Sequence, residues 1–218
     1  MFIIIYIVVL AAGTIAGEQS AGTMKLLAIR PFNRKKLLYG KMLAIFCVGL
    51  ILLTVSSIAT IVIGGINYGL GSATMLVIAD ATVAVPMSAF GVYIIAFMTM
   101  LIEIIFYATI SIFISTVFKS NIGAVTVSIL ILFVSLVLNI IAINVPILRF
   151  LPFTNVNLFK YFGASFLSSN SAQNVLQGIL TPSVFVGASF WFSFIYIAIT
   201  IAVLNVASYF KFKNQDIK

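Results

Sequence analysis

The amino-acid sequence predicts an all-α membrane protein, a polytopic bundle of about five transmembrane helices in one domain that covers residues 1–218. Composition is the first observation: 63% of the residues are hydrophobic and 7% are charged, against about 45–50% apolar and about 25% charged in soluble domains. The others are a series of long uncharged segments and a basic excess that alternates across them. Together they exclude a soluble enzyme, a secreted disulfide-bonded domain and a disordered protein.

Each expected span lies in a part of the chain that is almost free of charged side chains. A bilayer core about 30 Å thick needs roughly 20 apolar residues in a helix. A helix also satisfies its own backbone hydrogen bonds, which lipid cannot do. The expected spans are approximately residues 1–16, 42–63, 92–118, 122–143 and 190–210.

The net charge of +8 predicts the orientation of these spans, because cytoplasmic loops are enriched in Lys and Arg. Arg149 and Lys160 fall on one side, and the remaining basic residues fall on the other. We therefore expect the 17–41 segment and the C-terminus to be cytoplasmic. The cytoplasmic set is Lys25, Arg30, Arg34, Lys35, Lys36, Lys41, Lys119, Lys211, Lys213 and Lys218. Their expected contacts are anionic lipid headgroups rather than nucleic acid.

Few side chains offer catalytic or metal-binding chemistry. The chain has no histidine, and its single cysteine, Cys47, lies in an apolar run. These facts exclude His-based metal sites and catalytic triads, and also an intrachain disulfide. Gly40-Lys41 is followed by Met and lacks the upstream glycine of a P-loop. We expect no catalytic residue, no metal and no cofactor in this chain, and we expect that it is not an enzyme.

The 17–41 segment has the pattern of a short amphipathic helix bounded by turns. Gly17 and Gly22 permit sharp turns, and Thr23 can cap a helix that runs to Ile29. One helix face is apolar and is flanked by basic residues. That face suits either a groove on a cytoplasmic partner or the membrane surface. It comprises Met24, Leu27 and Ala28.

A proline separates this short helix from the next one. Arg30 precedes Pro31, and a residue before proline is disfavoured in the α conformation, so the first helix is expected to end there. Asn33 can cap a second helix that begins at Arg34 and continues into the next span.

This stretch resembles the signature of the ABC type-2 permease family, "GE…SGT…LL…P..R…LL.GK", which directly follows an early transmembrane helix. Ala21 stands where the family usually has Ser or Arg. Phe118-Lys119-Ser120 also resembles a turn of this family. The matching residues in the segment are Gly17, Glu18, Ser20, Gly22, Thr23, Leu26, Leu27, Pro31, Arg34, Leu37, Leu38, Gly40 and Lys41.

The resemblance implies the membrane-spanning permease subunit of a bacterial ABC exporter in the cell membrane. It implies a dimer with a second permease copy or a paralogue, and separate ATP-binding cassette subunits that use the ATP. The segment would form the coupling helix on which such a subunit docks. The docking residues implied are Glu18, Ser20, Gly22, Thr23, Met24, Leu27, Arg30, Pro31 and Arg34.

Members of the family usually have six spans, whereas this sequence predicts five. The abrupt apolar start at Met1 leads us to expect that the first family span is lacking. The positive charges follow the first apolar run instead of preceding it, so we interpret that run as an uncleaved span with its N-terminus outside.

The outer segment 144–189 mixes aromatic and polar residues and is broken by Pro146, Pro152 and Pro182. Such mixtures favour the membrane interface. By resemblance, the segment corresponds in position to short re-entrant helices before the last span. It is either an outer gate or an interfacial loop without a role in transport.

Glu103 lies near the centre of the third span. A charge at that depth costs roughly 2.5–3.5 kcal/mol and often has a function. Thr99 and Tyr107 share its helix face, so the three could line a translocation path. Alternatively, a protonated Glu103 bonds to a neighbouring helix. Gly13 and Gly17 form a G-x-x-x-G pattern, which we interpret as helix packing.

Three other functions compete with the exporter permease. One is a non-transporting immunity or sensor subunit that is associated with an ATP-binding protein. Another is an intramembrane enzyme, for which one central acid and a lone cysteine leave little chemistry. The last is a proton-driven secondary transporter, which could use Glu103 but would not need the signature in the 17–41 segment.

Overall fold

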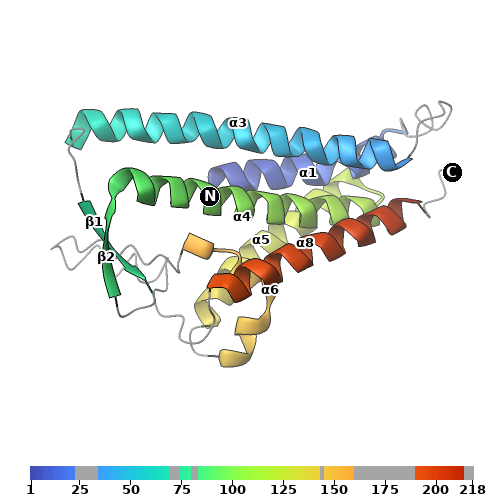
Figure 1. The fold of residues 1–218 in the computed structure, drawn as a ribbon. Coiled ribbons are helices and arrows are strands. Elements are labelled where there is room, and N and C mark those ends of the chain that lie inside the picture. The colour runs from blue at the N-terminus through green and yellow to red at the C-terminus, as the bar shows by residue number, and fades with distance from the viewer. Residues whose placement is uncertain (23–33, 69–73, 80–82, 143–144, 160–189, 214–218) are drawn as a thin grey trace. The chain divides into compact units, whose positions relative to one another are not determined.

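The computed structural model describes residues 1–22, 34–68, 74–79, 83–142, 145–159 and 190–213 (Figure 1). Five helices in these ranges are long and apolar enough to cross a membrane, which confirms the predicted helical membrane fold. Long apolar side chains exposed on them suit a lipid environment; Leu43 of the second helix is 63% exposed. The five are α1 (Phe2–Ser20), α3 (Arg34–Tyr68), α4 (Ala89–Val117), α5 (Asn121–Ile141) and α8 (Phe190–Lys213).

The described part of α3 starts at Arg34, where the sequence predicts a helix start; residues 23–33 before it lie outside the described residues. α1 continues to Ser20, beyond the expected end of the first span, so Gly17 is helical and does not form the turn expected of it. Ser20 supports this extra turn, because its hydroxyl donates to the carbonyl oxygen of Gly17 at 2.9 Å.

An antiparallel hairpin precedes α4, and the sequence patterns did not predict it. Strand β1 (Thr74–Ala79) pairs with β2 (Val83–Ser88), with Thr74 opposite Ser88 and Ala79 opposite Val83. Thr, Val and Ile favour strands because their branched side chains fit an extended backbone. Every strand of a two-stranded sheet is an edge strand, so Pro86 is tolerated within it.

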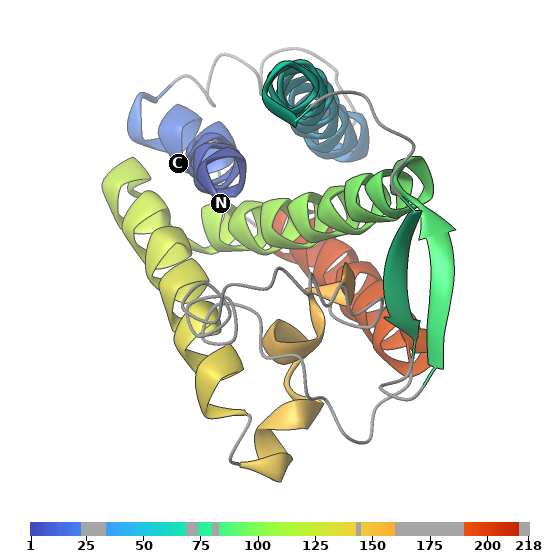
Figure 2. The ribbon, with the colours of Figure 1, turned by 90° about the vertical axis from the view of Figure 1, so that its left-hand side faces the viewer.

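The chain divides into two compact units. Unit 1 contains residues 1–53, 103–134 and 198–218. Its core forms around one face of α1 together with the large side chain of Phe106 on α4. Figure 2 shows α1 beside α4. The α1 residues of this core are 0–1% exposed and are Ile7, Val8, Ala11, Ala12, Ile15 and Ala16.

Gly49 allows α3 to approach the other helices of unit 1 closely. A Cβ atom added at Gly49 would lie 2.9 Å from Cγ2 of Ile104 on α4 and 3.6 Å from Cδ1 of Ile7 on α1. The first distance is shorter than van der Waals contact, so even alanine requires the Ile104 side chain or the helices to shift.

Unit 2 contains residues 54–102 and 135–197. Two short helices, η1 (Pro146–Phe150) and α6 (Pro152–Asn155), follow α5. Each begins at a proline that is expected from the sequence to break the outer segment. Side chains of α8 hold them: Ser193 donates to Oδ1 of Asn155 at 2.9 Å, and Tyr196 donates to the carbonyl oxygen of Phe150 at 2.6 Å. Residues 160–189 of the predicted outer segment lie outside the described residues.

We predict that Gly49→Ala destabilises the protein in detergent, because its new methyl group overlaps Ile104. Overpacking of a buried contact costs about 1–3 kcal/mol, and thermal unfolding measures it. Gly40→Ala is the matched control, since an added Cβ there meets nothing within 4 Å. An equal effect of both substitutions would show that close helix approach is not the cause.

Candidate functional site

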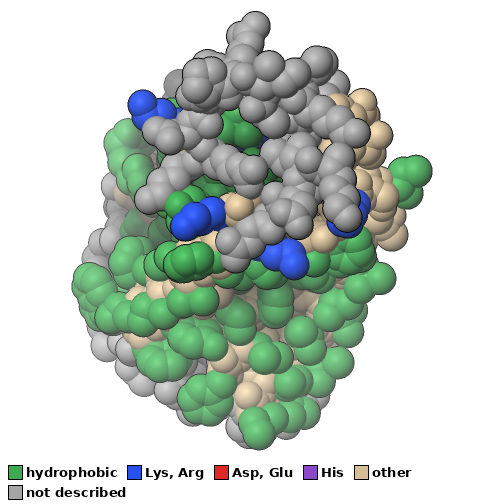
Figure 3. Space-filling view, turned by 90° about the vertical axis from the view of Figure 1, so that its right-hand side faces the viewer, with side chains coloured by type: hydrophobic (Ala, Val, Ile, Leu, Met, Phe, Trp, Pro, Cys, Tyr) green, Lys and Arg blue, Asp and Glu red, His purple; other side chains and the backbone are tan. Residues whose placement is uncertain are grey.

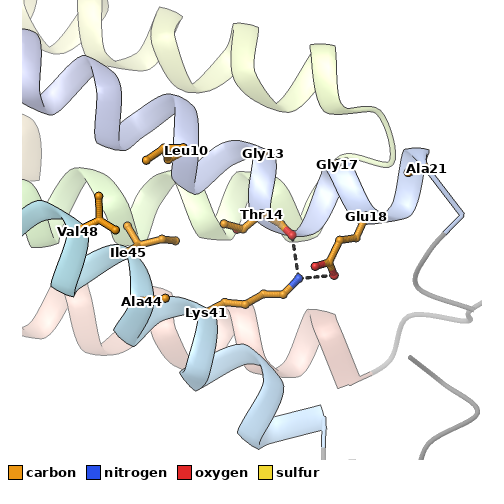
Figure 4. Close-up of a pocket in the computed structure, with 10 residues that line it drawn as sticks. All are labelled: Leu10, Gly13, Thr14, Gly17, Glu18, Ala21, Lys41, Ala44, Ile45 and Val48. Carbon is orange, nitrogen blue, oxygen red and sulfur yellow. Dashed lines mark hydrogen bonds and ion pairs between the residues drawn. The ribbon is translucent and has the colours of Figure 1, made fainter. Parts of the chain in front are cut away.

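The end of α1 and the beginning of α3 meet in unit 1 around one ion pair. Lys41 of α3 donates from Nζ to the carbonyl oxygen of Thr14 at 2.8 Å and pairs with Oε2 of Glu18 (Figure 4). The Lys41 side chain is 17% exposed and that of Glu18 is 34% exposed. The carboxylate and the carbonyl thus replace much of the water that the ammonium group loses.

The same residues close one end of a groove of about 460 Å³ between α1 and α3. Figure 4 shows Lys41 crossing from α3 to Glu18, while Leu10 and Val48 lie toward the other end. The groove therefore has an ionic end and an apolar end. Its remaining lining residues are Gly13, Thr14, Gly17, Ala21, Ala44 and Ile45.

The two glycines of the G-x-x-x-G pattern lie where α1 approaches the start of α5. A Cβ at Gly13 would stand 3.5 Å from Oδ1 of Asn121, and one at Gly17 would stand 3.7 Å from Cγ of the same residue. These are ordinary contact distances, so alanine would fit and a larger side chain would collide with Asn121. This arrangement agrees with the interpretation of the pattern as helix packing.

α1 ends in a left-handed turn at Gly22, whose φ is +72°. Its amide donates to the carbonyl oxygen of Gln19 at 3.2 Å, and the amide of Ala21 donates to that of Gly17 at 3.0 Å. Glycine adopts this conformation without the steric cost that a Cβ would add. Of the predicted turn residues, Gly22 therefore directs the chain out of α1.

The predicted docking residues fall into two groups. Glu18, Ser20 and Gly22 lie at the end of α1, and Arg34 is the first residue of α3. The others lie outside the described residues, as does the short helix predicted over residues 23–29. They are Thr23, Met24, Leu27, Arg30 and Pro31. Glu18 and Lys41 thus join the helices on either side of the segment that the sequence predicts to dock.

The exposed lysines among the described residues all belong to unit 1, and we call the surface that they form the basic face. Figure 3 shows basic side chains in blue next to a broad hydrophobic surface. They come from the start of α3, the turn between α4 and α5, and the end of α8. The residues are Lys36, Lys119, Lys211 and Lys213. All four belong to the side that the charge distribution predicts to be cytoplasmic.

The predicted path residues lie on α4 at intervals of four positions. Glu103 is half-buried, whereas Thr99 and Tyr107 are 6% and 5% exposed. Thr99 donates its hydroxyl to the carbonyl oxygen of Ala96 at 3.0 Å, within its own helix. The rings of Tyr107 and Phe106 pack nearly perpendicular to each other, with centroids 5.5 Å apart. A helical spacing of four keeps the three residues on one face of α4.

The sequence patterns mark Glu18 and Lys41 separately and do not predict that they pair. One signal for the pair was available, because Glu18 is the only acidic residue among six basic ones in residues 17–41. A second interhelical contact, made by Ser115 of α4, carries no signal in its surrounding sequence. Within the described part of the chain, no group of three His, Cys, Asp or Glu side chains is placed to hold a metal ion.

Comparisons with known proteins agree with the resemblance in the 17–41 segment. A family model described as "ABC-2 family transporter protein" matches residues 1–217. A curated relative, the uncharacterized protein YhcI of Bacillus subtilis (strain 168), is 29% identical over 162 residues. The match covers 72% of this chain and 51% of the relative, so the chain spans about half of the relative's length. No solved structure matches the chain.

We predict that Glu18→Lys and Lys41→Glu each destabilise the protein in detergent by about 1–3 kcal/mol, because each leaves a partly buried charge beside a like charge. The double charge swap should recover about half of the loss. Recovery stays incomplete because the Thr14 carbonyl oxygen still loses its donor. Thermal unfolding compares the three variants.

Lys36→Glu is the control for the charge swap, since Lys36 is exposed on the same helix. A double swap that is no more stable than the weaker single variant would contradict the importance of the ion pair.

Proposed function

Because the chain belongs to the ABC-2 transporter family, we propose that it is the membrane-spanning permease subunit of a bacterial ABC exporter. Membrane proteins of this family work with an ATP-binding subunit in ABC transporters. The chain is accordingly a transporter permease and not itself a catalytic enzyme. In the proposal, a separate subunit hydrolyses ATP, and this chain moves the substrate outward across the cell membrane together with a second permease copy or a paralogue.

The observation that carries this proposal is the pair between Glu18 and Lys41. It joins the last turns of α1 to the first turns of α3, on both sides of the predicted docking segment. A force applied to that segment by a partner therefore reaches two spans together. Closure of the ATP-binding subunits would then displace the ends of both helices as one body, as in other domain-closure transitions.

The basic face supports the proposed orientation. Its exposed lysines lie near the start of α3, in the turn between α4 and α5 and at the end of α8, all within unit 1, together with the Glu18–Lys41 pair. Cytoplasmic ends of membrane helices are enriched in Lys and Arg, and such residues also attract anionic lipid headgroups. We therefore assign this face and the C-terminus to the cytoplasm, where an ATP-binding subunit would be found.

The docking contact is proposed for the 17–41 segment as a whole. Gly22 sets the direction in which the chain leaves α1, Glu18 pairs with Lys41, and Ser20 is exposed at the same helix end. In this proposal Thr23, Met24, Leu27, Arg30 and Pro31 contact the partner, and Arg34 starts the helix that receives the displacement.

The proposed translocation path follows the face of α4 that carries Thr99, Glu103 and Tyr107. Glu103 supports this choice, because a carboxyl group at the middle of a membrane helix is costly and is commonly retained for function. The hydroxyl groups of its neighbours would extend a polar stripe along the helix.

We predict that Gly22→Val reduces co-purification with the ATP-binding cassette subunit at least fivefold. A β-branched residue at φ +72° is strained by about 1–2 kcal/mol, so the chain leaves α1 in another direction. The measurement is affinity purification of the tagged full-length chain co-expressed with that subunit, followed by assay of bound ATPase activity.

Gly64→Val is the matched control for this experiment, since a Cβ at either glycine meets nothing within 4 Å and only Gly22 has a positive φ. Absence of an ATP-binding subunit from the wild-type complex would contradict the proposed function. A complex that forms but moves nothing would instead favour the immunity or sensor role.

We predict that Glu103→Gln lowers substrate-stimulated ATPase activity of the assembled complex at least fivefold without lowering its thermal stability. Removal of a charge from the middle of a span relieves an insertion cost, so a loss of activity would not result from unfolding. Thr109→Val is the control; Thr109 is 3% exposed on α4 and donates only within its own helix, to Ile105 at 2.8 Å. Unchanged activity would contradict a role of Glu103 in the translocation path.

A further inference from the structure

Ser115 of α4 makes an unusual set of contacts with α1. Its side chain is fully buried. Its hydroxyl donates to the carbonyl oxygen of Ala12 at 2.6 Å and accepts from the amides of Ile15 at 3.1 Å and Ala16 at 2.9 Å. One oxygen atom therefore contacts three backbone groups of another helix, about one hundred residues away in the sequence.

Other hydroxyl groups of α4 behave differently. Serine and threonine in membrane helices commonly bond a carbonyl oxygen three or four residues earlier in the same helix. Thr109, Ser111 and Thr116 do so, at 2.8, 2.9 and 2.6 Å. Ser115 lies one turn after Ser111 and is equally buried, but its hydroxyl bonds across to α1. Its three bonds are thus specific to the α1–α4 contact.

The turn of α1 that bonds Ser115 also bonds Lys41 of α3. Lys41 of α3 donates to the carbonyl oxygen of Thr14, a residue that falls in sequence between Ala12 and Ala16, which bond Ser115. Small residues on this face, Ala12 and Ala16, let α4 approach closely enough for its short side chain to reach the α1 backbone. The turn that precedes Gly17 and Glu18 is therefore bonded to two other helices.

We propose that Ser115 is a positioning residue that makes the end of α1 and the end of α4 move together when the docking segment is displaced. This inference rests on the proposed function. Packed alanine and isoleucine side chains allow helices to slide or rotate against each other, but three directional hydrogen bonds to one oxygen oppose both motions. Displacement of α1 then passes to Val117, at the end of α4.

The experiment uses the full chain, in complex with its ATP-binding cassette subunit, and a spin label at Val117→Cys in a Cys47→Ser background. Val117 is 42% exposed at the end of α4, so a label fits there. We expect Mg-ATP to change the label's mobility when Ser115 is present. Ser115→Ala should reduce that change at least fivefold while the complex still assembles and hydrolyses ATP.

Ser111→Ala is the matched control. It removes the same atom from the same buried helix face, but the bond that it loses lies within α4. A merely structural role of Ser115 would lower the thermal stability of Ser115→Ala and leave the response of the label to ATP intact. A preserved response in Ser115→Ala would therefore overturn the proposal.

A second measurement on the chain alone separates this inference from the proposed function. Hydrogen–deuterium exchange of the α1 amides at Ile15 and Ala16 should become at least threefold faster in Ser115→Ala and stay unchanged in Ser111→Ala. Unchanged exchange in Ser115→Ala would overturn the contact itself. Failure of the wild-type chain to bind any ATP-binding subunit would overturn the proposed function, and with it the transfer of motion.

Discussion

Hydrocarbon provides no hydrogen-bond partners, so a polar group inside a span gains stability when another part of the protein bonds it, and the contact between α1 and α4 in unit 1 depends on this constraint. Most hydroxyl groups of α4 meet it locally by bonding their own helix. Ser115 meets it by bonding α1, and this choice fixes the distance and rotation between two helices. The hydroxyl oxygen of Ser115 thus helps to position α1 against α4.

The constraint also explains which features the sequence predicts. Charge-free segments are a local property of the sequence, so the five spans follow from them. The hairpin over residues 74–88 was not predicted, because a short apolar run gives little signal to separate strand from loop. Ser115 looks like Ser111 in sequence, and only the packing of α1 against α4 distinguishes their partners.

The site shows the same division between local and distant information. Gly22 was predicted as a turn residue, and its positive φ confirms that role, since the preference of glycine is a property of one residue. Gly17 was predicted to turn and is helical instead, and it packs beside Asn121 of α5, a proximity that no local pattern describes. The Glu18–Lys41 pair likewise joins residues whose partnership depends on how α1 and α3 pack.

The two contacts that hold α1 differ in how the environment affects them, and this difference bears on their roles. The Glu18–Lys41 pair is partly exposed, so dissolved ions screen it and a competing charge on a partner could replace either member. Ser115 is fully buried and its bonds involve no net charge, so salt and surface charge leave them unchanged. A docking partner can therefore act on the ion pair while the α1–α4 contact persists. The exposed Glu18–Lys41 pair suits a point where a partner's movement reaches the protein. The buried Ser115 contact suits the transfer of that movement from α1 to α4.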